Sequence, residues 1–273
     1  MRGFLSRLQI SCGVLLVVAA FRAYSVEPIT IDLPKPVPVG FAGSDLQVSI
    51  LLQNPNAEQI ETALSTRVWQ QSASTLMPLS PARPCWSGKI EGNAKINAVA
   101  RMSLPEVRAA VRFQLHVLTN DGKTLAKVPI IAVPKTWFGE QLFHLPVALA
   151  LYDPEARISA ALRQLEVKFH EVETVDEAAV IPKALCVLVP AATEAERVLE
   201  VVNERAGRGQ ATAIVVDASG AAEKEVAGAA RGSSEDYTNL HDSAGAQFRF
   251  VTLLQQALRL KNPTDSHGNT LEP

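Results

Sequence analysis

Acidic side chains follow two apolar runs in the second half of the chain, and they are the first candidates for chemistry. Asp153 comes directly after Leu145–Tyr152 (LPVALALY), and Asp217 follows Ala213–Val216 (AIVV). If these runs are parallel strands, both carboxylates lie at the carboxyl edge of one sheet, where open α/β sheets bind ligands. Glu171 would lie near the rim of that edge. Such a cluster would favour cations, amines or sugar hydroxyls over phosphates.

A structural role accounts for the same aspartates, and it is the interpretation that we favour. Aspartate is a preferred helix N-cap. Asp153-Pro154 also has the order of a cap followed by proline in the first helical turn. We therefore expect these carboxylates to stabilise helix ends and turns rather than to bind a ligand.

Nucleophilic and metal chemistry find little support in the sequence. Cys186 lies in the middle of ALCVLV, where a thiol acts as a small hydrophobe and burial raises its pKa. Neither a Gly-x-Ser-x-Gly elbow nor a phosphate-binding glycine loop is present, and no His-x-x-x-His or Cys-x-x-Cys pair occurs. His241-Asp242 is the best acid–base pair, although adjacent side chains rarely face one site. We expect no catalytic residue, no metal and no cofactor.

Residues 1–25 have the pattern of a secretory signal peptide. Arg2 and Arg7 precede the apolar run Gly13–Phe21, and Ala23-Tyr24-Ser25 offers small residues at a cleavage site. Because the run is much shorter than the about 20 residues of a spanning helix, we expect no transmembrane span after cleavage. An uncleaved anchor is the alternative. Export would place the chain in the periplasm or outside the cell.

Residues 26–136 alternate apolar and polar side chains, which is typical of half-buried strands. Arg112–Leu118 alternates in this way, and Asn120-Asp121-Gly122 turns it back into Thr124–Val133. Prolines 28, 34, 36 and 38 punctuate an extended entry that we expect at a sheet edge. About seven such strands predict an antiparallel β-sandwich.

Aromatic side chains of this half could hold sugars. On that hypothesis Trp86 is a candidate binding residue. We favour the alternative that Trp86 lies in a loop, next to Cys85, and fills space there. We expect Trp69 to belong to the core. His116 falls on the face opposite the apolar stripe, where we expect it to face solvent or to contact a neighbouring strand rather than to bind a ligand.

The pattern changes after residues 137–144, which we expect to be a linker, and predicts an α/β domain over 145–262. Continuous apolar runs predict buried parallel strands, and helical spacings alternate with them. Thr193 with Glu196 predicts a capping box for the helix that follows. No fifth strand is evident: residues 221–234 read as a helix that frays into a loop, and 263–273 as a disordered tail.

Both halves resemble known folds. The first is similar to immunoglobulin- and fibronectin-III-like domains, on strand pattern alone and without paired cysteines. The second, through VALALYDPEARISAALRQLEV, ALCVLVP and AIVVDAS, resembles flavodoxin-like and class I glutamine-amidotransferase-like domains. That resemblance implies a three-layer α/β domain with a mainly parallel sheet, as found beside β-sandwiches in large bacterial secreted proteins. The amidotransferase nucleophile is a cysteine on a strand-to-helix elbow, which Cys186 does not occupy.

Composition narrows the function further. Aromatic residues make up 5% of the chain and its net charge is -2, which argues against nucleic-acid binding. We expect an exported, non-catalytic binding or assembly module of the bacterial envelope, with a protein or glycan as its partner. The alternative is a glycan-active enzyme or accessory subunit that uses the strand-end carboxylates. A fragment of a larger enzyme is a third possibility.

Overall fold

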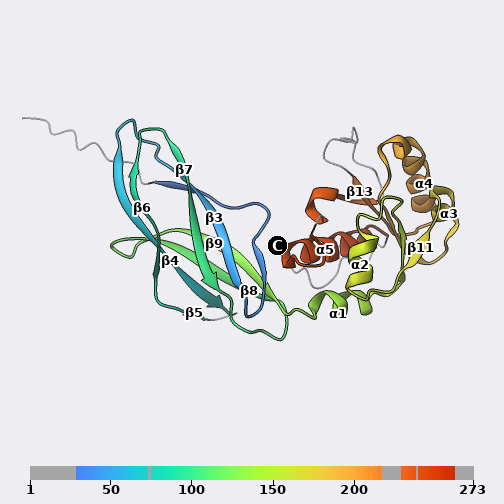
Figure 1. Cartoon of the computed structure of the whole chain (residues 1–273), viewed down its shortest axis with the longest axis horizontal. Helices are drawn as coiled ribbons and strands as arrows, with labels where there is room; N and C mark the ends of the chain where they lie inside the picture. Colours follow the sequence, from blue (N-terminus) through green and yellow to red (C-terminus); the bar gives the residue numbers. More distant parts are fainter. Residues whose placement is uncertain (1–28, 73–74, 217–228, 238, 262–273) are drawn as a thin grey trace, which may run out of the picture.

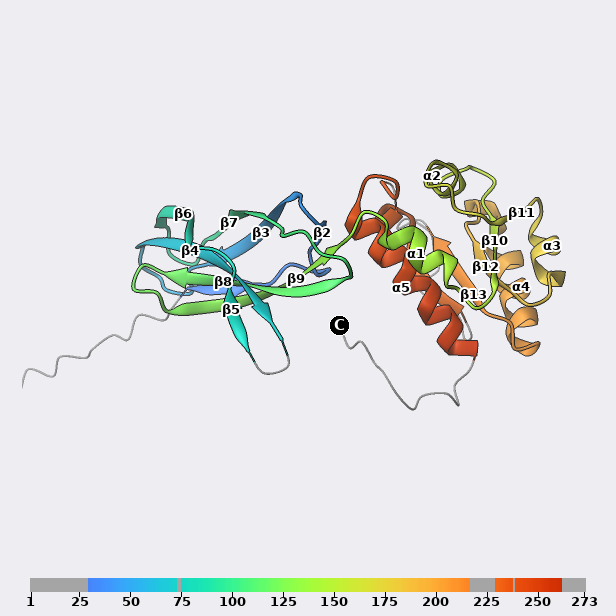
Figure 2. The same cartoon turned by 90° about the horizontal axis from the view of Figure 1, so that it is seen from below.

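The chain forms two lobes joined by a short helix, as Figures 1 and 2 show. The computed structural model describes residues 29–72, 75–216, 229–237 and 239–261. The first lobe consists of β-strands, and the second has a parallel sheet with helices on both faces. The expected signal peptide and tail lie outside the described residues, and so does Asp217.

Two sheets pack face to face in the first lobe. The smaller has the order β1-β3-β7 (Thr30–Asp32, Asp45–Gln53, Lys95–Ser103). The larger has the order β2-β9-β8-β4-β5 (Val39–Phe41, Thr124–Val133, Val111–Thr119, Ile60–Gln71, Leu76–Pro78), and β6 (Arg83–Ile90) also pairs with β4. All pairs are antiparallel except β2 with β9. The proline-punctuated entry supplies the edge strands β1 and β2, as predicted.

Alternation along each strand builds the core of the sandwich. In β3, β7 and β8 every second side chain is buried between the sheets, because successive side chains of a strand point to opposite faces. The apolar side chains that meet there include Ile50, Ala100, Phe113, Leu115 and Val117. The predicted hairpin between β8 and β9 is present, and Gly122 adopts a φ of 82° in its turn.

Five parallel strands form the sheet of the second lobe, in the order β11-β10-β12-β13-β14. Their bounds are His170–Val172, Ala148–Tyr152, Ala184–Leu188, Thr212–Val216 and Ala229–Ser233. The expectation that a fifth strand is lacking was wrong. Strand β14 has the sequence AARGS, which carries none of the large apolar side chains that reveal the other buried strands.

Helices cover both faces of this sheet. Helices α2 (Ser159–Gln164) and α5 (Ala244–Lys261) share one apolar cluster with the sheet, and α3 (Val175–Val180) and α4 (Ala195–Gly207) share the other. Sequence analysis missed α3. Its signal was Thr174 three residues before Glu177: the Thr174 hydroxyl accepts a hydrogen bond from the Glu177 N–H at 3.1 Å.

The expected cap of α4 at Thr193 was also wrong. A 3₁₀ turn, Ala192–Glu194, precedes this helix and moves its start one residue later, to Ala195. Glu194 takes over the local role, because its Oε2 accepts a hydrogen bond from the Ala191 N–H at 3.1 Å.

The connection between the lobes is itself packed. The expected linker forms α1 (Trp137–Phe143), whose first two aromatic side chains are buried. Trp137 stacks on Phe248 of α5 with ring centroids 5.4 Å apart, and Ile131 of β9 belongs to the same apolar cluster. The apolar contact therefore continues from the sandwich into the α/β lobe. Among the described residues, no helix is both long and apolar enough for a membrane crossing.

Candidate functional site

Asp153 lies at the end of β10, as predicted, and its carboxylate binds the chain itself. It accepts hydrogen bonds from the backbone N–H groups of Arg157 (3.1 Å), Ile158 (2.7 Å) and Ser159 (2.7 Å). These N–H groups belong to the turn before α2 and to the first residue of that helix. The first N–H groups of a helix have no acceptor within the helix, so they need one from outside. Asp153 is not the expected N-cap, because α2 begins six residues later, at Ser159, and Pro154 lies before the helix. Its carboxylate instead holds the turn that leads into α2, and this structural role leaves little of it for a ligand.

Glu171, the other described carboxylate predicted at this edge, is paired with an arginine. Glu171 lies on β11 and is exposed, and it pairs with Arg163 of α2 through contacts of 2.6 and 2.7 Å. Asp217 lies outside the described residues. Among the residues that the structure covers, no group of three or more His, Cys, Asp or Glu side chains has the placement of a metal site.

A tyrosine–glutamate pair spans the point where the strand order reverses. Strand β10 is followed in sequence by β11 on one side and then by β12 on the other, and ligands bind at such switch points in open α/β sheets. Here the Tyr152 hydroxyl donates to Glu194 Oε1 at 2.6 Å. Burial and the charge of Glu194 raise the pKa of Tyr152 to about 12. Sequence analysis missed this pair, because nothing in the sequence links two residues so far apart.

Neither Cys85 nor Cys186 has the surroundings of a nucleophile. Cys186 is fully buried, and desolvation raises its thiol pKa to about 11, against a smaller opposite effect of Arg205. Cys85 lies in β6 rather than in a loop and is half-buried, which raises its pKa as well. His241 and Asp242 contact each other at 2.7 Å on the surface, with both side chains exposed.

Trp69 and Trp86 both depart from their expected places. Trp69 alternates with the buried Val68 and so lies on the outer face of the larger sheet rather than in the core. It stacks on His116 with ring centroids 5.2 Å apart, which is the cross-strand alternative expected for His116. The other alternative, a side chain facing solvent, was wrong, because His116 is only 4% exposed. Trp86 is not in a loop: it belongs to β6 and packs, half-buried, against the sandwich core. Its binding role stays a prediction.

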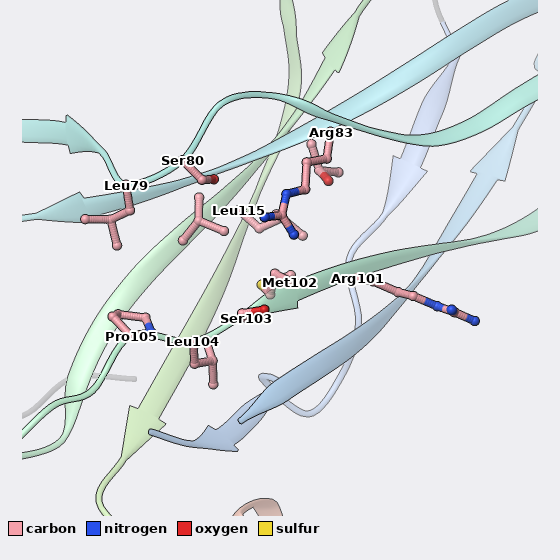
Figure 3. A pocket seen from close by; sticks show the side chains of 11 residues that line it. Leu79, Ser80, Arg83, Arg101, Met102, Ser103, Leu104, Pro105 and Leu115 are labelled. Carbon is pink, nitrogen blue, oxygen red and sulfur yellow. The ribbon is translucent and has the colours of Figure 1, made fainter. Parts of the chain in front are cut away.

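A cavity of about 260 Å³ opens between the two sheets of the sandwich. Its walls come from the inner face of β4 and β8, from the end of β7, and from the connection between β5 and β6 (Figure 3). The lining residues are Thr66, Val68, Leu79, Ser80, Arg83, Arg101, Met102, Ser103, Leu104, Pro105 and Leu115. Apolar side chains predominate, and a few polar groups lie among them, which is the usual composition of small-molecule sites.

Two features of the cavity are open to a ligand. The Arg83 side chain has no hydrogen bond or ion pair with any described residue. Thr66 is only 4% exposed, yet its hydroxyl has no partner in the described part of the chain either. That hydroxyl is not among the side-chain atoms that are shut off from solvent without a partner, so at the cavity wall it is accessible to a ligand or to water. Sequence analysis did not find this site, because its residues come from four separate stretches of the chain, within 66–68, 79–83 and 101–105 and at 115.

Comparison with known proteins gives no family. No protein-family model matches the chain, and no curated protein is detectably similar to it in sequence. Similar solved structures include the alkylpurine DNA glycosylase AlkC of Pseudomonas fluorescens, at 13% identity and a TM-score of 0.31, over 38% of this chain and 30% of that one. A β-glucosidase from Listeria innocua shares 9% identity over 39% of this chain and 16% of its own, with a TM-score of 0.31.

A third similar structure is a Niemann-Pick type C2 protein from the Japanese carpenter ant. It shares 10% identity over 39% of this chain and 89% of its own length, with a TM-score of 0.28. The chain spans less than a third of the glycosylase and about a sixth of the glucosidase.

Proposed function

We propose that this chain is an exported, non-catalytic binding module of the bacterial envelope and that its β-sandwich holds the ligand. The observation that carries the proposal is the cavity between the sheets, with an apolar wall and an arginine that has no partner among the described residues. Export rests on the signal pattern of residues 1–25. A protein or glycan of the envelope is the macromolecular partner that we propose for the assembled module.

The finer fold assignments belong to the same proposal. For the sandwich, the sheet β1-β3-β7 and the run β9-β8-β4 correspond to the A-B-E and G-F-C strands of an immunoglobulin-like domain. Strand β6 departs from that scheme, because it pairs with β4 rather than with β7. For the α/β lobe, the order β11-β10-β12-β13-β14 is the 2-1-3-4-5 order of flavodoxin-like domains. Both orders support the proposed folds.

The glycan-active alternative has weaker support. A glycosidase needs two carboxyl groups about 5–10 Å apart, one of them able to exchange a proton. Asp153 is held by three backbone N–H groups and Glu171 by Arg163, so neither is free for that role.

The test measures the intact mass of the protein purified from its native host under non-denaturing conditions. We expect a chain that begins near Val26 and carries a bound small molecule. A matched pair of variants locates that molecule: Ser80→Phe places a ring in the cavity, whereas Ser87→Phe places one on an exposed position of β6. Only Ser80→Phe should lose the bound mass. Equal retention by both folded variants would contradict the cavity as the binding site, and an intact Met1 on cytoplasmic protein would contradict export.

A further inference from the structure

We propose that the cavity of the sandwich binds a small amphipathic anion, with an apolar chain between the sheets and a carboxylate at Arg83. This inference rests on the proposed binding function and names the class of ligand. Its three parts are the apolar wall, the unpaired cation and the size of the space.

The wall of the cavity favours a hydrocarbon chain. Val68, Leu79, Met102, Leu104 and Leu115 come from both sheets and from the β5–β6 connection, so an apolar chain would contact them from several sides. Of these, Leu79 is 37% exposed, which leaves part of the wall in contact with water when the cavity holds no ligand. Covering such a surface is a favourable step in binding, since it removes apolar area from water.

The charge at the cavity favours an anionic head group. The eleven described lining residues include two arginines and no acid. Figure 3 shows the guanidinium of Arg83 directed into the space between the sheets, toward Leu115, and that of Arg101 directed away from it. The guanidinium of Arg83 presents the planar donor arrangement that matches a carboxylate.

Arg83 is the cation that faces the ligand because of its register. It pairs with Thr66, whose side chain is buried on the inner face of β4, so both side chains lie on the cavity side of the sheet. Arg101 instead alternates with the buried Ala100 and Met102 of β7 and lies on the outer side. The unpartnered Thr66 hydroxyl adds a hydrogen-bond donor near Arg83, which a carboxylate oxygen accepts.

The volume limits the length of the apolar chain. At about 30 Å³ for each water-sized group, 260 Å³ accommodates about nine such groups. A chain of about eight carbon atoms therefore fills the cavity with its carboxylate at the mouth. Longer chains extend into solvent and gain no further contact.

The experiment measures binding by isothermal titration calorimetry with three probes that share one chain: octanoate, octanol and octylamine. We expect octanoate to bind most tightly and octylamine to bind most weakly. Arg83→Gln should weaken octanoate about tenfold, which is the usual effect of losing one charged hydrogen bond, and should leave octanol unchanged. The matched control Arg101→Gln removes the same charge from the same rim and should change octanoate binding by less than about twofold.

Chain length gives an independent readout. From butanoate to octanoate, each added methylene should tighten binding up to about fourfold, and decanoate should bind no more tightly than octanoate. A series that keeps tightening beyond ten carbons would contradict the cavity as the place of the chain.

The outcomes separate this inference from the function on which it rests. If octanol binds as tightly as octanoate and Arg83→Gln has no effect, the ligand class is wrong and the binding function stands. If Arg101→Gln weakens octanoate as much as Arg83→Gln does, the specific role of Arg83 is wrong. If none of the probes binds, and Ser80→Phe also leaves the native-host mass unchanged, both proposals fail together.

Discussion

The two lobes differ in how they use the polar groups of their candidate sites. In the α/β lobe, the groups that could have formed a site are bound by the chain itself: Asp153 holds the start of α2, and Tyr152 is bonded to Glu194. In the sandwich, Arg83 and Thr66 have no side-chain partner among the described residues and line a cavity. The α/β lobe, whose sequence offers more candidate catalytic residues, thus uses those residues to stabilise its own fold. A site is identified by groups that the fold leaves unpaired, and residue type alone does not reveal them.

Arg205 provides the strongest test of the idea that polar side chains of the α/β lobe stabilise the fold through hydrogen bonds within that lobe. Its side chain is fully buried and donates hydrogen bonds to Thr212 Oγ1 and to the backbone carbonyls of Ala178, Ile181, Ala184 and Ala211, at 2.7–3.3 Å. Arg205→Ala removes all of these donors and leaves a void. We expect a loss of about 4 kcal/mol in the free energy of unfolding, measured by urea denaturation.

Arg208, one residue beyond the end of α4, is the matched control. It also donates to a carbonyl, that of Ala179, but its side chain is about half exposed and pairs with Glu204 at the surface. Water can replace its contacts, so Arg208→Ala should cost less than about 1 kcal/mol. Equal losses for the two variants would mean that the buried guanidinium has no special role.

Asp153 tests the next largest effect and the boundary between structure and function. Asp153→Ala removes the acceptor of three backbone N–H groups. We therefore expect the free energy of unfolding, obtained from thermal denaturation, to fall by about 1–2 kcal/mol. Glu171→Ala, which removes only an exposed ion pair, should cost less than about 0.5 kcal/mol. Neither variant should alter octanoate binding. A metal- or glycan-dependent stabilisation of the parent chain that vanishes in Asp153→Ala would reverse the comparison and support the enzyme alternative.

The sequence predicted the periodic parts of this molecule well and the long-range parts poorly. Alternation along β3 and β7 predicted strands because each buries every second residue. Continuous runs predicted β10, β12 and β13 because both faces of that sheet are covered. Strand β14 was missed because short alanine- and glycine-rich strands carry almost no apolar signal. A structural role for Asp153 was predictable from its place at the end of a strand, but its partners were not, because an intervening turn delays the start of α2 to Ser159. The cavity was not, because it depends on how far apart two sheets lie.

Tyr152 tests the smallest effect, with a dependence on pH that follows from its burial. Tyr152→Phe removes the hydrogen bond to Glu194, and we expect a loss of about 1 kcal/mol at pH 8. The unfolded chain releases the phenol proton near pH 10, whereas the folded chain holds it to about pH 12. The stabilisation by Tyr152 is therefore fully present below pH 10 and is lost as the pH rises toward 12.

Denaturation at pH 8, 10 and 11 should show the parent losing its advantage in stability over Tyr152→Phe. Glu194→Gln, which keeps an acceptor but removes the charge, should lose less stability than the parent over this range, since that charge helps to raise the pKa. Parallel pH curves for the parent and Tyr152→Phe would show that the pair is open to solvent, and the switch point would then again be a place where a ligand could bind.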